Sequence, residues 1–159
     1  MTNMKRRTFL KGSVAAGAVG AALGAGLLTP RMVLAAWPTA AFEAKSVDSA
    51  LDALVGSHAL EGSDKITIRA PDIAENGAVV PVSVTTGIAN AESISIIAEK
   101  NASPLTASFM LGAGAEGFVS TRIKMGKTSS VIAVVKADGK LYSTGKEVKV
   151  TIGGCGGYL

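Results

Sequence analysis

The sequence is poor in the residues that build metal sites and disulfides. It holds one cysteine, Cys155, and one histidine, His58, among 159 residues. A single cysteine excludes a disulfide within the chain. A zinc site takes three or four cysteine, histidine or carboxylate ligands, and a blue-copper site takes two histidines with a cysteine. No such cluster is visible, so we expect no metal and no cofactor, and we interpret His58 as a surface loop residue.

Acidic residues are missing from the first 35 positions. This segment holds five of the 16 basic residues and none of the 12 acidic ones. The remaining 11 basic residues balance 12 acidic ones, so the net charge of +4 comes from the N-terminal segment. Without that segment the chain lacks the excess of positive charge that drives binding to nucleic acid or to an anionic membrane.

The first 35 residues have the order of features of an export signal. Arg6 and Arg7 precede an uncharged, apolar run from residue 12 to residue 28, and small residues follow at the expected cleavage site. The paired arginines resemble a twin-arginine signal, which a receptor recognises. We expect export to the periplasm, with cleavage after Ala35 or, alternatively, Ala36. A retained membrane helix is the competing interpretation, but 17 residues rich in glycine and alanine are short for a span of about 20.

The last seven residues, which we call the carrier arm, hold the lone thiol. Two glycines flank Cys155 on each side, namely Gly153, Gly154, Gly156 and Gly157. Glycine loses the most entropy when it is ordered, so this frame predicts a flexible arm rather than a packed core site. An unpaired cysteine in an exported protein indicates an intermolecular bond or a reactive group. A buried structural thiol is the alternative that the glycines disfavour.

Other charged residues offer weaker sites. Cys155 with His58 as its base would make a nucleophilic pair, but such a pair needs rigid placement, which a glycine tether does not give. Arg122, Lys124 and Lys127 could form a small basic patch for an anion, although a solvated strand end is the simpler interpretation.

The region from residue 36 to residue 152 predicts one β-rich domain. Ser46 caps a short amphipathic helix that ends at Gly56 and could begin nearer Thr39. Alternating apolar residues then predict eight strands, at 65–70, 79–86, 93–99, 105–111, 117–124, 130–137, 140–144 and 147–152. The spacing predicts an all-β fold, an immunoglobulin-like antiparallel β-sandwich, with a small barrel as the alternative.

Two dipeptides and one proline mark details of that domain. Asn76-Gly77 and Asp138-Gly139 are strong turn signals, and the second predicts a tight hairpin. Pro81 has no N–H for a sheet, so its strand should meet solvent or a bulge there.

Four segments resemble the SoxY family of the periplasmic thiosulfate-oxidising Sox system. They are residues 71–82, residues 99–101, residues 120–125 and the tail 148–157. With the twin-arginine leader, the resemblance spans nearly the whole chain. It departs from the family at Tyr158 and Leu159, because the family usually ends close to the second pair of glycines.

The resemblance implies an immunoglobulin-like sandwich that pairs with a SoxZ subunit. Cys155 would be the attachment point for thiosulfate-derived sulfur, joined by a c-type Sox cytochrome. A hydrolase would then release sulfate, and a sulfur dehydrogenase would oxidise the remaining sulfur. The leading hypothesis is therefore a sulfur carrier that is not itself an enzyme. A structural subunit whose Cys155 forms an intermolecular disulfide is the alternative, and a thiol enzyme is a third.

Overall fold

The structure, a computed structural model, describes residues 38–151 of the chain. The predicted leader and the carrier arm lie outside these residues. The described part contains two helices, α2 (Thr39–Glu43) and α3 (Val47–Val55). It also contains nine strands, β1 (Leu60–Gly62), β2 (Ile66–Arg69), β3 (Ile73–Ala74), β4 (Val80–Thr86), β5 (Ala91–Ala98), β6 (Leu105–Met110), β7 (Phe118–Ile123), β8 (Ser129–Ala137) and β9 (Lys140–Val150).

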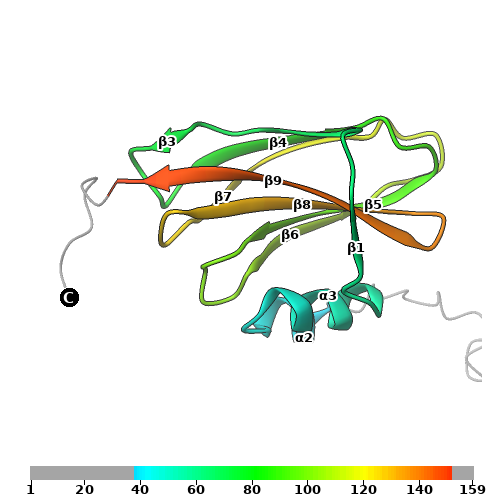
Figure 1. Cartoon of the computed structure of the whole chain (residues 1–159), viewed down its shortest axis with the longest axis horizontal. Helices are drawn as coiled ribbons and strands as arrows, with labels where there is room; N and C mark the ends of the chain where they lie inside the picture. Colours follow the sequence, from blue (N-terminus) through cyan, green and yellow to red (C-terminus); the bar gives the residue numbers. More distant parts are fainter. Residues whose placement is uncertain (1–37, 152–159) are drawn as a thin grey trace, which may run out of the picture. The chain divides into compact units, whose positions relative to one another are not determined.

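The strands form two sheets that enclose one core (Figure 1). The larger sheet has the order β1-β9-β8-β5-β6, with β3 added beside β9, and the smaller has the order β2-β4-β7. The alternating valines of β4, Val80, Val82 and Val84, are buried against Ile94 and Ile96 of β5, so period-two patterning produces this core. The predicted immunoglobulin-like sandwich is confirmed.

The two helices cover the outer face of the larger sheet. Leu51 of α3 is buried with Ile97, Val134 and Leu141, whose side chains lie on the sheet face opposite the sandwich core. Strand β8 is therefore buried on both faces, which explains its nearly continuous apolar sequence. Ser46 caps the start of α3, as predicted, because its hydroxyl accepts a hydrogen bond from the Ser49 amide.

The helix prediction is largely correct. Gly56, in the left-handed region at φ 79°, ends α3 as predicted. Residues nearer Thr39 form the separate helix α2, because Ala44 adopts an extended conformation between the two helices. Among the described residues, no helix is long and apolar enough to span a membrane.

Strand β9 differs from its prediction. The predicted strands 140–144 and 147–152 are one strand, whose antiparallel pairing with β8 continues from Lys140 opposite Ala137 to Val148 opposite Ser129. Gly145, between the two predicted strands, is paired with Ile132. The short strands β1 and β3 were not predicted, and both pair with β9 in parallel rather than antiparallel orientation. Strands of two or three residues are too short for an alternating pattern to reveal.

The predicted turns and the proline position are confirmed. Asp138 and Gly139, with φ values of 49° and 75°, join β8 to β9 in a two-residue hairpin. Asn76 begins a turn in which its backbone carbonyl accepts from Val79 and its side chain accepts from Ala78. Pro81 is exposed and lies beyond the last pair of β2 with β4, so it meets solvent on the β2 side, while on the other side it lies opposite Arg122 of β7.

Candidate functional site

The predicted site residues, Cys155 with Gly153, Gly154, Gly156 and Gly157, lie outside the described residues, so the structure does not place them. It does place the strand that leads to them. Strand β9 ends at Val150, and Thr151 is the last described residue, four positions before Cys155. The candidate site is therefore the end of the sandwich at which β9 stops, which we call the arm end.

The last residues of β9 are held on both sides. Beside β3, the Lys149 amide donates to the Asp72 carbonyl at 2.9 Å, and the Thr151 amide donates to the Ala74 carbonyl at 3.1 Å. On the other side, the Val150 amide donates to the Thr128 hydroxyl at 2.9 Å. Hydrogen bonds therefore fix the backbone up to the residue four positions before the thiol.

A glycine lets the Asn76 turn approach β9 closely. The Gly77 carbonyl accepts a hydrogen bond from the Met125 amide at 2.7 Å. A side chain at Gly77 would collide with the Met125 carbonyl oxygen and would lie 2.7 Å from Cγ1 of Val150. The turn thus locks the β7–β8 connection and the end of β9 together, which only a residue without Cβ permits.

An ion pair adds a further link between β9 and the chain before β3. Lys146 Nζ lies 3.0 Å from the Asp72 carboxylate and donates to the Ala70 carbonyl at 2.6 Å. Asp72 is the more exposed partner, so the pair contributes little stability by itself, about 0–1 kcal/mol. Its effect is to position the segment that runs beside β9.

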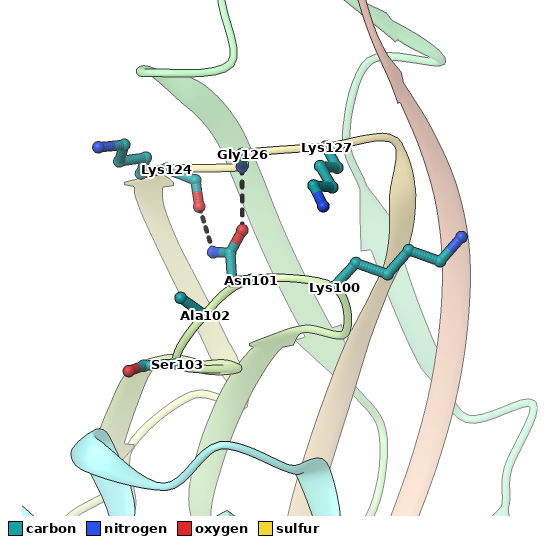
Figure 2. A pocket seen from close by; sticks show the side chains of 7 residues that line it. All are labelled: Lys100, Asn101, Ala102, Ser103, Lys124, Gly126 and Lys127. Atoms are coloured by element: carbon teal, nitrogen blue, oxygen red, sulfur yellow. Dashed lines mark hydrogen bonds between the residues drawn. The ribbon is translucent and has the colours of Figure 1, made fainter. Parts of the chain in front are cut away.

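The two remaining loops of the arm end are joined by one amide side chain. Asn101, in the β5–β6 loop, donates through Nδ2 to the Lys124 carbonyl at 2.7 Å and accepts through Oδ1 from the Gly126 amide at 2.9 Å. Figure 2 shows both hydrogen bonds across the gap between the loops. One side chain therefore satisfies two backbone groups of the β7–β8 connection, which fixes that loop relative to β5–β6.

A hollow of about 480 Å³ lies where these loops meet. Its lining residues are Lys100, Asn101, Ala102, Ser103, Lys124, Gly126 and Lys127 (Figure 2). Of the three cations that the sequence offered for a small basic patch, Lys124 and Lys127 line this hollow. Arg122 does not line the hollow, because it lies opposite Pro81 within the smaller sheet. Lys100 was missed, since only the folded chain brings the β5–β6 loop to this place.

His58 belongs to a different region. It lies between α3 and β1, and β1 pairs with the beginning of β9 rather than its end. Its Nδ1 is 2.8 Å from the Asp52 carboxylate, and the hydrogen bond and charge of Asp52 raise the His58 pKa. Both side chains are about half exposed, which confirms the surface position of His58. Among the described residues, no cluster of three metal-ligating side chains occurs.

Comparison with known proteins identifies the family. The family model of the sulfur oxidation protein SoxY matches residues 51–155. The chain belongs to the SoxY family. A solved structure, that of the sulfur carrier protein SoxY from Chlorobium limicola f thiosulfatophilum, is 48% identical to this chain. The match covers 67% of this chain and 97% of that one, with a TM-score of 0.62. No curated protein matches the chain.

The match to the SoxY family model covers the whole arm end. It begins within α3 and ends at Cys155, so it includes every loop of the arm end. The segments 71–82, 99–101 and 120–125, far apart in the sequence, are joined by the hydrogen bonds from Met125 to Gly77 and from Asn101 to Lys124, and Gly77 lies close to Val150 at the end of β9. Three of the SoxY-like segments noted in the sequence are thus in contact with one another at the arm end.

Proposed function

We propose that this SoxY protein carries sulfur covalently on Cys155 and presents it to partner enzymes on the carrier arm. The observation that carries the proposal is the anchored end of β9, which is bonded on both sides four residues before the lone cysteine. The sandwich supplies a rigid support, and the glycines around Cys155 would supply the conformational freedom. The chain itself would perform no catalysis.

The proposed chemistry begins with an oxidative coupling. The Cys155 thiol loses a proton and joins the outer sulfur of thiosulfate, giving Cys–S–S–SO₃⁻, while two electrons pass to a c-type cytochrome. A hydrolase then adds water across the bond to the sulfonate, releasing sulfate and two protons and leaving Cys–S–S⁻. A sulfur dehydrogenase would act on that persulfide. The Sox cytochrome, the hydrolase and the dehydrogenase are partners that we infer from family membership.

The proposal includes a partner subunit and a compartment. We infer a SoxZ-like subunit that forms a heterodimer with this chain, from the same family membership. We infer export to the periplasm by the twin-arginine route, from Arg6, Arg7 and the apolar run that follows them.

A reconstituted Sox system tests the carrier function. The Cys155→Ser variant should keep the fold and lose thiosulfate-dependent cytochrome reduction completely, since no other cysteine can take its place. Retention of full activity by Cys155→Ser would exclude the proposal. Gels run with and without reductant test the structural alternative, because a permanent disulfide to one partner chain would leave no thiol to load.

A further inference from the structure

We propose that strand β6 is a docking edge for a second copy of this chain, and that the two β6 strands pair antiparallel to join the two larger sheets. An edge strand presents backbone N–H and C=O groups at the spacing of another strand, so the edge itself specifies an extended strand as its occupant. The inference is independent of the function proposed for Cys155.

Strand β6 has a neighbour on one side only. It is the last strand in the order β1-β9-β8-β5-β6, and no strand of the described chain pairs with its other side. The Leu111 amide donates to the Glu92 carbonyl at 2.8 Å, and hydrogen-bonded residues alternate along an antiparallel pair. Phe109 therefore directs its backbone groups toward β5, whereas Ser108 and Met110 direct theirs away from it.

Strand β6 also lacks the features that protect an edge. Natural sheets protect their edges with charged side chains, prolines, bulges or very short strands. Of the other outermost strands, β2 contains Arg69, β7 contains Arg122, and β1 and β3 have only three and two residues. Strand β6 has six residues, and no residue from 101 to 115 is charged. Protection is confined to its start, where Pro104 precedes it and its pairing with β5 is bulged after Ile96.

The missing charge favours a second copy as the occupant. In a two-fold pair each residue meets its own counterpart or a symmetry-related neighbour, so a charged edge would tend to repel itself. An uncharged β6 meets no such repulsion. With the two-fold axis at Ser108, the outward backbone groups of Ser108 pair with their own counterparts, and Met110 lies opposite Thr106 of the second copy. Met110 is 81% exposed, more than any other exposed large apolar side chain of the described chain, and this pairing would cover part of it.

Antiparallel pairing keeps the two arm ends apart. Strand β6 begins after the β5–β6 loop, which belongs to the arm end, and it stops at the loop 111–117, at the opposite end of the sandwich. Two antiparallel copies of β6 therefore place the two arm ends at opposite ends of the joined sheet. A dimer of this kind leaves both arm ends open to partner enzymes.

Sedimentation equilibrium of the exported chain carrying Cys155→Ser tests the association, because this variant excludes an intermolecular disulfide. A single strand pair is a small interface, so we expect a dissociation constant of about 1–100 µM. Met110→Lys should weaken the dimer at least about tenfold, because an edge lysine opposes strand pairing. Val79→Lys, in the Asn76 turn, is the matched control, since Val79 is also exposed, and it should leave the affinity unchanged. A monomer at every concentration, or equal weakening by both variants, would overturn the proposal.

Hydrogen exchange followed by NMR tests which edge is used. The Ser108 and Met110 amides should exchange more slowly as the dimer forms, whereas the Phe109 amide should be protected at every concentration. A dimer with unchanged exchange at Ser108 and Met110 would place the interface elsewhere and overturn the proposal. Slowing that appears only after a SoxZ-like subunit is added would overturn the second copy as the occupant. Both measurements use protein without the Cys155 thiol, so the carrier function is judged separately.

Discussion

The two ends of the sandwich differ in their charges more than in their construction. The opposite end, which we call the far end, comprises the loops 87–90 and 111–117 and the turn at 138–139. Each end is tied by backbone hydrogen bonds, from Met125 to Gly77 at the arm end and from Thr86 to Gly117 at the far end. The lysines of the hollow at the arm end, however, have no carboxylate partner among the described residues, whereas Lys136 and Lys140 near the far end are paired with Glu92 and Glu61.

The far end instead exposes apolar surface. Met110 and Phe118 are 81% and 48% exposed, and they flank a loop rich in glycine and alanine. Backbone hydrogen bonds therefore do not by themselves distinguish the two ends, since both ends have them. What distinguishes the arm end, among the described residues, is a set of lysines without a carboxylate partner.

The largest expected effect comes from a side chain at Gly77. Gly77→Ala places a Cβ against the Met125 carbonyl and Val150, so it should lower the free energy of unfolding by about 2–3 kcal/mol. Urea denaturation measures the change. At the far end, Gly112→Ala is the matched control, because nothing lies within 4 Å of the added Cβ, and its effect should stay within about 0.5 kcal/mol. Equal losses in the two variants would show that the close packing at Gly77 does not hold the arm end.

A smaller effect is expected from the Asn101 side chain. Asn101→Ala removes two hydrogen bonds between loops and should cost about 1–2 kcal/mol. Hydrogen exchange at the Gly126 amide should accelerate in the same variant, since that amide loses its acceptor. Asn90→Gly is the far-end control, because its side chain makes one longer, exposed bond of 3.3 Å to Asp138 and its φ of 56° suits glycine. Unchanged exchange at Gly126 would contradict the role of Asn101.

The smallest effect concerns His58, away from the arm end. Asp52 raises the His58 pKa in the folded chain, so protonation favours folding. This contribution is complete below the unfolded pKa of about 6.5 and is lost as the pH rises through the folded value. NMR titration of the single histidine should show a lower pKa in Asp52→Asn, together with a weaker dependence of stability on pH. An unchanged pKa would mean that another group controls His58.

The sequence predicted those parts of the fold that local patterning determines. The alternating valines predicted β4, and Asp138-Gly139 predicted the hairpin between β8 and β9. The parallel strands β1 and β3 escaped prediction because their pairing with β9 depends on backbone bonds between distant segments. Helix α2 was only suggested, because a break at Ala44 has no strong sequence signal.

For the candidate site, too, the sequence indicates some residues, while others come together only in the folded chain. Composition alone singled out Cys155 and its glycines, because a lone framed thiol is visible without a fold. The sequence indicated only part of the lining of the hollow. Lys124 and Lys127 are close in sequence, whereas Lys100 belongs to another loop. Arg122 was grouped with them by sequence proximity, but strand pairing places it opposite Pro81.

The most direct test is the mass of the C-terminal peptide from protein isolated under non-reducing conditions from thiosulfate-oxidising cells. We predict that a fraction of Cys155 carries an additional sulfur-containing group, thiosulfonate or persulfide, and that reductant removes it. An unmodified Cys155 in every preparation from actively oxidising cells would contradict covalent carriage of sulfur by this chain.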